Sequence, residues 1–283
     1  MKIWSDVEYV YRCLADVQRT SAFEAAIASA VKPGDVVLDL GTGSGIMALF
    51  AVRAGARKVY AVEIGDYLSR VSQQIFAENG FASRIVSLPM DARDVNLSCV
   101  EKPDVVICEM ITTGLIGEMQ GPVITALKKS GVIDNHTTVI PSALKISASL
   151  VHVDYTSFGF QVRFPIFIDY FSRGFDRQVE TLSNRATLHS IDFPSDFNDA
   201  VRAETTYAVT RAGQINGVLV ESSTELTKGV SIEYCVSYCQ PVILPTQDFD
   251  VTVGENVSLS LQYQIGQGFD TLSLDLRKKV DEW

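Results

Sequence analysis

The sequence predicts an α/β unit built on a parallel sheet, followed by an all-β barrel or sandwich. In the first half, short apolar runs alternate with stretches of helical period, which is typical of buried strands covered by helices. Beyond Pro141, apolar and polar residues alternate instead, most regularly over residues 257–265. We therefore expect a helical segment over residues 1–30, the α/β unit over 31–141 and the β unit over 142–283.

The composition excludes several classes of function. The 283 residues include 24 Lys and Arg against 34 Asp and Glu, so the net charge of −10 disfavours nucleic acid as a partner. The five cysteines form neither a disulfide framework nor a metal-ligand pattern, which favours a reducing cytoplasm and no bound metal. No apolar run approaches the roughly 20 residues of a membrane helix, so we expect no membrane partner.

A helical lead-in precedes the α/β unit and extends to about Ala30. Ser5-Asp6-Val7-Glu8 has the form of a capping box, because Glu8 stands three residues after Ser5. Arg19 lies within this lead-in and has two interpretations. It is either a solvated surface arginine or, if the lead-in folds over a ligand, a planar fork for a carboxylate.

The turn after the first predicted strand is the strongest candidate binding site. The apolar run 36–38 predicts a buried strand, and the apolar stretch 46–54 predicts a helix that ends at Gly55. Between them lies Asp39-Leu40-Gly41-Thr42-Gly43-Ser44-Gly45. Its three glycines let the backbone turn sharply and let a ligand approach without meeting a Cβ atom.

The spacing of these glycines and the next strand indicate the ligand. A dinucleotide fingerprint needs a third glycine at position 46, which is Ile46. Glu63 ends the second strand, predicted over 59–62, where its carboxylate can accept hydrogen bonds from a ribose diol. Together these features resemble the class I S-adenosylmethionine-dependent methyltransferases, which implies a Rossmann-like α/β unit and S-adenosylmethionine as the cofactor.

A third strand adds another acid at the same sheet edge. After a helix that begins near Asp66, the strand 84–88 is followed by Asp91 and Ala92. The Asp91 carboxylate could accept from an adenine amino group while the Ala92 N–H donates to the ring. A solvated Asp91 is an equally good interpretation.

Two glutamates follow the fourth predicted strand, 104–108. Glu109 ends the strand and Glu118 stands nine residues later, before a helix predicted to end at Lys129. Nine steps of 100° would put the two side chains on opposite faces of one helix, so a shared ligand requires a turn, which residues 112–114 permit. Buried together, two carboxylates indicate a cationic ligand; the alternative is two surface glutamates at a helix end.

The second half alternates with period two between turn residues. The strands predicted there cover residues 143–153, 206–210, 218–226, 230–238 and 257–265. Cys235 and Cys239 are four residues apart in a strand-like stretch, which favours small core residues over metal ligands. Residues 174–190 interrupt the pattern with a charged insert whose composition also fits a helix.

The combination resembles the protein arginine methyltransferase family. The stretch VLDLGTGSGIMALFAVRAGARKVYAVE looks like the family's motif I and post-I, and Asp16 to Arg19 looks like its cofactor-covering helix. Residues Glu109 to Glu118 look like its double-E loop, in a form closer to the monomethylating branch and to bacterial homologues labelled predicted RNA methylases.

The resemblance implies N-methylation of a guanidino group in arginine, an arginine-containing peptide or a guanidine small molecule. It implies Glu109 and Glu118 as catalytic residues. The cofactor-binding residues implied are Arg19, Asp39, Gly41, Thr42, Gly43, Gly45, Glu63, Ile64, Asp91, Ala92 and Glu109. Two alternatives are a methyltransferase acting on RNA or on a small N or O nucleophile, and a catalytically silent cofactor-binding scaffold.

Three departures from the family bear on substrate and assembly. Its aromatic N-terminal helix is largely missing, although Tyr9 and Tyr11 could partly replace it. Its Thr-His-Trp loop reads as residues 236–238, Val-Ser-Tyr. Its dimerisation arm can correspond only to residues 174–190, which are too short for a full helical pair, so we expect a homodimer through this arm to be weak or absent.

Overall fold

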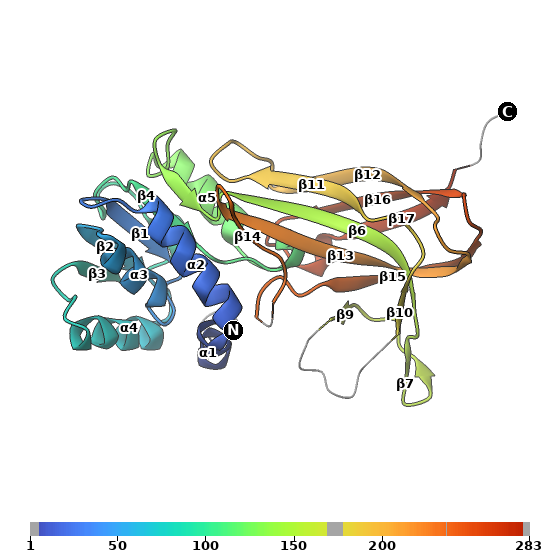
Figure 1. Cartoon of the computed structure of the whole chain (residues 1–283), viewed down its shortest axis with the longest axis horizontal. Coiled ribbons are helices and arrows are strands. Elements are labelled where there is room, and N and C mark those ends of the chain that lie inside the picture. The colour runs from blue at the N-terminus through green and yellow to red at the C-terminus, as the bar shows by residue number, and fades with distance from the viewer. Residues whose placement is uncertain (1–5, 169–177, 236, 280–283) are drawn as a thin grey trace.

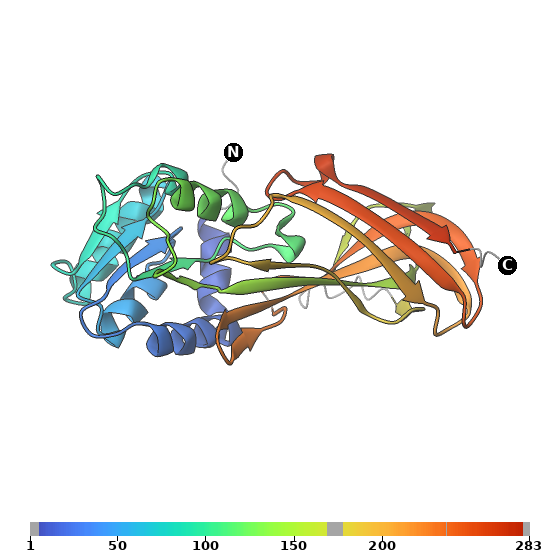
Figure 2. The same ribbon diagram turned by 90° about the horizontal axis from the view of Figure 1, so that it is seen from above.

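The computed structural model describes residues 6–168, 178–235 and 237–279, which form an α/β unit and an elongated β unit (Figure 1). Seen from above, the two units follow one another along the long axis of the molecule (Figure 2). One set of buried apolar side chains, from Phe23 to Ile265, continues through both units. The boundary is therefore packed and not a loose linker.

The α/β unit contains a five-stranded sheet in the order β3-β2-β1-β4-β5, with every pair parallel. The strands are β1 (Val36–Leu40), β2 (Lys58–Val62), β3 (Ile85–Leu88), β4 (Val105–Cys108) and β5 (Thr138–Ile140). All five residues of β1 are buried, as expected for the central strand of a parallel sheet. The chain order reverses between β1 and β4, so the crevice for a ligand lies at the carboxyl ends of these two strands.

The helices of this unit are α1 (Val7–Ala15), α2 (Val17–Ala30), α3 (Ile46–Ala54), α4 (Asp66–Glu78) and α5 (Gln120–Lys129). Short 3-10 turns are η2 (Ala92–Asp94) and η3 (Thr113–Leu115). The lead-in is two helices and not one, because Asp16 is extended and its side chain caps α2 by accepting from the Arg19 N–H at 3.1 Å. Asp6 caps α1, while the predicted cap Ser5 lies outside the described residues.

The β unit is antiparallel throughout, with a seven-stranded sheet that includes the long pair β6 and β13 and a three-stranded sheet β12-β16-β17. A small hairpin, β7 with β8, projects from it (Figure 1). The elements are β6 (Ala143–Val153), β7 (Thr156–Ser157), β8 (Phe160–Gln161), β9 (Ile166–Phe167), β10 (Val179–Thr181), β11 (Ala186–Asp192), β12 (Ala200–Ala208), β13 (Gly213–Thr227), β14 (Val230–Ile232), β15 (Val242–Val251), β16 (Asn256–Gln264), η4 (Phe269–Thr271) and β17 (Ser273–Lys278).

Two expectations for this half were wrong. Residues 174–177 lie outside the described residues, but the rest of the insert, up to residue 190, contains β10 and most of β11, both paired with β6. Sheet pairing and the burial of Leu182 therefore outweigh the helical composition. The strand predicted over 230–238 ends at Ile232, because the chain leaves the sheet and turns towards α2.

Within the described ranges, no helix is long and apolar enough to cross a membrane. The same residues contain no group of three or more side chains that could together hold a metal ion.

Candidate active site

The glycine turn folds over the end of β2. The N–H groups of Gly41 and Thr42 both donate to the Val62 carbonyl at 2.9 Å, and the Gly43 N–H donates to Glu63 Oε2 at 3.1 Å. Gly41 and Gly43 have φ of 69° and 51°, in the left-handed region that favours glycine. The predicted turn and the predicted strand-end acid are therefore in direct contact.

Gly45 has a different place from the other two glycines. Its φ is 81°, and a Cβ atom there would lie 2.5 Å from the ring of Phe76 on α4. It does not line the cavity described below, so this glycine is required for packing behind the turn.

Two acids lie beneath the turn. Asp39 is 2% exposed and accepts a 2.5 Å hydrogen bond from the Thr42 hydroxyl, and burial raises the pKa of Asp39 to about 7. Glu63 is 5% exposed, and its second carboxylate oxygen accepts from the Gly65 N–H at 2.8 Å. Hydrogen bonds from nearby residues thus hold both carboxylates at the carboxyl edge of the sheet.

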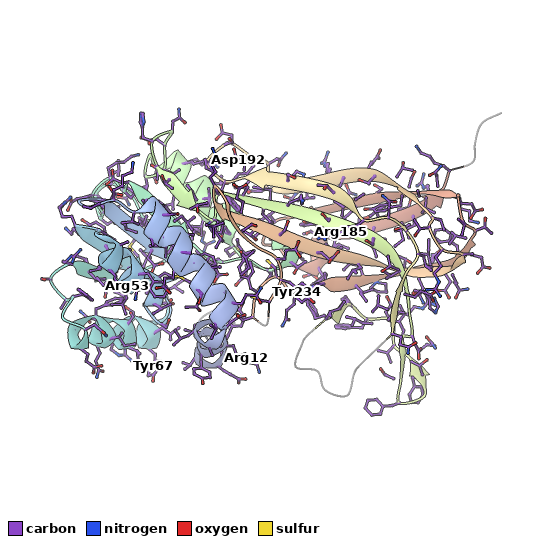
Figure 3. The ribbon with its side chains drawn as sticks, viewed as in Figure 1. Arg12, Arg53, Tyr67, Arg185, Asp192 and Tyr234 are labelled. Atoms are coloured by element: carbon purple, nitrogen blue, oxygen red, sulfur yellow. The ribbon has the colours of Figure 1, made fainter. Side chains whose placement is uncertain are left out.

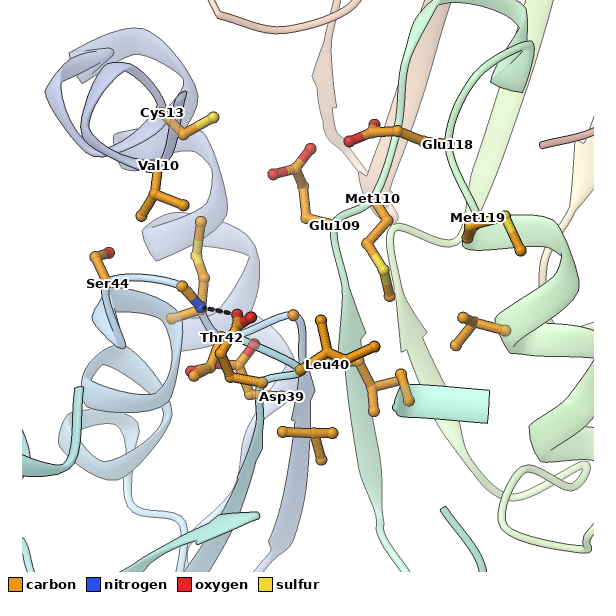
Figure 4. Close-up of a pocket in the computed structure, with 18 of the residues that line it drawn as sticks. Val10, Cys13, Asp39, Leu40, Thr42, Ser44, Glu109, Met110, Glu118 and Met119 are labelled. Atoms are coloured by element: carbon orange, nitrogen blue, oxygen red, sulfur yellow. Dashed lines mark hydrogen bonds between the residues drawn. The ribbon is translucent and has the colours of Figure 1, made fainter. Parts of the chain in front are cut away.

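A cavity of about 470 Å³, the first cavity, opens over this edge (Figure 4). It is lined by the turn, α1, η2 and the residues after β4. Apart from Gly45, the residues predicted as site residues line it: Arg19, Asp39, Gly41, Thr42, Gly43, Glu63, Ile64, Asp91, Ala92, Glu109 and Glu118. Residues distant in the sequence thus meet at the topological switch point.

The two glutamates point towards one another across this cavity (Figure 4). Glu109 forms an ion pair with Arg19 Nη2, and both side chains are largely buried. Glu118 is 4% exposed, and its Oε2 has no hydrogen-bond partner among the described residues. Buried carboxylates are rarely left unpaired, so the Glu118 oxygen can accept a hydrogen bond from a cationic ligand.

Electrostatics at this pair follow from burial. Burial, and then the charge of Glu109, raise the pKa of Glu118 well above its usual value. Burial also raises the pKa of Glu109, although Arg19 opposes the shift. Burial lowers the pKa of Arg19, but the neighbouring Glu109 carboxylate raises it, and the net shift of the Arg19 pKa is upward.

The turn that brings the glutamates together is η3. Gly114 has φ of 66° and Leu115 has φ of 54°, so the chain reverses within residues 113–115, close to the predicted position. We call residues 109–118 the glutamate segment.

The β unit holds the glutamate segment from several strands. The Tyr263 hydroxyl donates to the Gly114 carbonyl at 2.6 Å, and the Gly114 N–H donates to Ser222 Oγ at 2.9 Å. The Thr113 hydroxyl donates to the Gln240 carbonyl at 2.6 Å. The position of Glu118 therefore depends on the second half of the chain.

Asp91 lies at the cavity wall but is already engaged. Its carboxylate forms an ion pair with Arg93 at 2.6 Å and caps η2 by accepting from the Arg93 N–H at 2.9 Å. Ala92 is buried beside it. A ligand that reaches Asp91 would share this carboxylate with Arg93.

Sequence reasoning missed some residues of the site and only suggested others. Of the two tyrosines suggested from the sequence, Tyr9 lines the cavity, whereas Tyr11 does not and is 66% exposed. Burial, and then the charge of Glu118, raise the pKa of Tyr9. Gln120 is fully buried and accepts from the Met110 N–H at 3.0 Å, a position that no motif marks. Ser237, in the altered three-residue loop, donates from its N–H and hydroxyl to Asp16 at 2.8 and 2.9 Å.

The parallel sheet, glycine turn and cavity define a Rossmann-like methyltransferase fold joined to an antiparallel β unit. A protein-family model described as "Ribosomal protein L11 methyltransferase (PrmA)" matches residues 18–151. The Streptomyces achromogenes subsp. streptozoticus protein "Arginine N(omega)-methyltransferase" is 25% identical over 247 residues, covering 78% of this chain and 65% of the relative. "Uncharacterized protein MJ1452" of Methanocaldococcus jannaschii is 35% identical over 153 residues, covering 52% of this chain and 58% of the relative. The chain thus spans less than two thirds of either relative.

The fold is shared along nearly the whole chain. The solved structure described as "Trypanosoma brucei PRMT1 enzyme-prozyme heterotetrameric complex with AdoHcy" superposes with a TM-score of 0.79 at 18% identity, covering 99% of this chain and 95% of that one. These similarities confirm the resemblance to the arginine methyltransferases and the order of an α/β unit followed by an antiparallel β unit.

Proposed function

We propose that this protein is an S-adenosylmethionine-dependent methyltransferase that acts on a guanidino nitrogen. The observation that carries the proposal is the buried pair Glu109 and Glu118, which face one cavity while Glu118 keeps an unpartnered carboxylate oxygen. The similarity to an arginine N(omega)-methyltransferase supports the same acceptor group.

The described residues fit this cofactor. The glycine turn offers a backbone without Cβ atoms at Gly41 and Gly43. The Glu63 carboxylate would accept from a ribose diol, and Arg19, which lines the cavity, would bind the cofactor carboxylate. Asp91 and Ala92 would contact the adenine ring, and Ile64 and Thr42 also line the cavity. When bound, S-adenosylmethionine supplies an electrophilic methyl group on a sulfonium.

Charge balance favours two cationic groups in this cavity. Five acids line it (Asp39, Glu63, Asp91, Glu109 and Glu118) against two arginines, Arg19 and Arg93. A sulfonium and a guanidinium would offset part of this excess, whereas an anionic acceptor would add to it.

The glutamates would activate the acceptor. A guanidinium has a pKa above about 12, so its nitrogens are poor nucleophiles until one lone pair is localised. Glu118 would bind the guanidinium through charge-assisted hydrogen bonds, while Glu109, fixed by Arg19, would orient the reacting nitrogen. The raised pKa of Glu118 suits it to accept the proton that the nitrogen releases when the N–C bond forms.

The test is methyl transfer from isotopically labelled S-adenosylmethionine to a panel of arginine, arginine peptides, other guanidines and RNA, followed by mass spectrometry. We expect label on a guanidino nitrogen. Label confined to RNA or to amine and hydroxyl acceptors would instead support the alternative methyltransferase activity. Cofactor binding with no transfer to any acceptor would indicate a silent scaffold.

We also propose that the protein works in a reducing compartment such as the cytoplasm, because its five cysteines are all free. Thiol counting on protein isolated from native cells under acid quench tests this. A native disulfide would contradict it.

A further inference from the structure

A second cavity, of about 360 Å³, is lined by residues in the middle of the glutamate segment, whereas the two ends of this segment line the first cavity. Tyr9 lines both cavities, so a molecule whose reactive end lies between the glutamates can extend past Tyr9 into this space. The second cavity is bounded by α1, the glutamate segment, β9 and η4. This inference rests on the proposed function, because it concerns what else the methyl acceptor carries.

The walls of the second cavity are mainly apolar. Ile111, Ile116 and Val242 are at most 3% exposed, and Phe167 and Phe269 form an edge-to-face pair with ring centroids 6.1 Å apart. Such a surface fits an aliphatic stem.

Three hydroxyl groups in these walls make hydrogen bonds within the protein. Thr113 donates to the Gln240 carbonyl, Ser237 donates to Asp16, and Thr112 Oγ1 accepts from the Gly117 N–H at 3.2 Å. The walls therefore offer a ligand more contact area than hydrogen bonding.

Arg12 supplies the only formal charge among the described lining residues of this cavity, and no carboxylate lines it. Arg12 stands three residues after Tyr9 on α1, so the two side chains share one helix face about 5 Å apart. Arg12 is 60% exposed, and among the described residues its ion-pair partner is the more exposed Glu8, four residues earlier, at 2.7 Å. An exposed pair of this kind is weak, so a ligand anion can compete for the guanidinium.

The two cavities thus carry opposite local charges, because acids predominate around the first and an arginine lines the second. We propose that the second cavity is an acceptor subsite that selects a guanidine with a short apolar stem ending in an anion, such as a guanidino acid, with Arg12 binding the anion. A basic peptide, which would place further cations beside Arg12, is disfavoured.

Two small guanidines isolate the far-end charge. 4-Guanidinobutyrate ends in a carboxylate, whereas agmatine has a similar stem and ends in an ammonium. We expect wild-type kcat/KM to favour 4-guanidinobutyrate by about tenfold, the size of one partly exposed charge-assisted contact. Arg12→Glu should remove or invert this preference, and Arg12→Gln should reduce it.

Arg53→Glu is the matched control. Arg53 is 61% exposed and pairs with Glu24, but it lies on α3 and lines neither cavity (Figure 3). This change should leave the preference intact, which separates a local contact from a change in net charge.

The outcomes distinguish this inference from the proposed function. Equal rates for both compounds, a preference that survives Arg12→Glu, or methylation of arginine in a basic peptide but of neither small guanidine would overturn the subsite and leave guanidine methylation standing. Transfer to no guanidine at all would overturn both.

Discussion

Replacing Tyr263 with phenylalanine tests whether the β unit positions the glutamate segment. Tyr263 is 3% exposed, and its hydroxyl donates to the Gly114 carbonyl at 2.6 Å inside the turn between Glu109 and Glu118. Removing it leaves a buried carbonyl without this partner, which costs about 1–3 kcal/mol in the free energy of unfolding. The turn would also relax, so kcat/KM for methyl transfer should fall by roughly tenfold or more while cofactor affinity stays unchanged.

Tyr207→Phe is the matched control. Tyr207 is also fully buried in the β unit, but its hydroxyl has no hydrogen-bond partner in the described parts of the chain. Its removal should change the free energy of unfolding by less than about 0.5 kcal/mol. Urea denaturation, calorimetry with S-adenosylhomocysteine and steady-state kinetics on both variants give the comparison. Equal effects of the two substitutions on stability and on kcat/KM would refute the reasoning.

Three further predictions address the cofactor, the turn and assembly. Glu63→Ala should weaken the binding of S-adenosylmethionine and of its demethylated product by about 1–3 kcal/mol in calorimetry. The wild-type protein should not bind NAD. Unchanged affinity in the variant would remove Glu63 from the cofactor site. Gly45→Ala should lower the free energy of unfolding by about 1–3 kcal/mol more than Gly80→Ala. Both glycines have positive φ, but only at Gly45 would a Cβ atom meet the Phe76 ring. Equal decreases in the free energy of unfolding, measured by urea denaturation, would contradict this packing argument. Self-association should be weak by light scattering. It should depend on the β7–β8 hairpin, which exposes Phe158 and Phe160, rather than on residues 174–190. A tight dimer that persists in the double variant Phe158→Ser/Phe160→Ser would count against that expectation.

The α/β unit could be predicted closely because its signals are local. The helix 46–54 and its end at Gly55 are found at the predicted positions. The spacing of the apolar residues and the left-handed conformation of Gly55 are local signals that do not depend on distant residues. The glycine turn and Glu63 lie together for the same reason: parallel strands bring their carboxyl ends to one edge.

The β unit was harder to predict because pairing partners decide its elements. The charged composition of the insert 174–190 also fits a helix, yet β10 and β11 pair with β6. The strand expected over 230–238 is interrupted where Ser237 reaches Asp16, more than 200 residues earlier in the chain. Composition alone does not encode such long-range contacts.

The candidate site shows the same division. Glu109, Glu118 and Arg19 could be named from motifs, but the ion pair between Arg19 and Glu109 joins residues 90 positions apart and depends on the tertiary fold. Gln120 and Tyr263 were missed because each acts through one hydrogen bond to the backbone, which leaves no spacing pattern in the sequence.

The most direct test of the central claim is the turnover of Glu118→Gln with S-adenosylmethionine and a guanidine acceptor both at saturation. Glu118 is the better glutamate to change, because Glu109→Gln would also leave the buried Arg19 without its charged partner. Glutamine keeps the shape but removes the charge, so the fold and cofactor affinity should persist while methyl transfer falls by about 10²-fold or more. Near-normal turnover in Glu118→Gln would contradict the assignment of this carboxylate to guanidine activation.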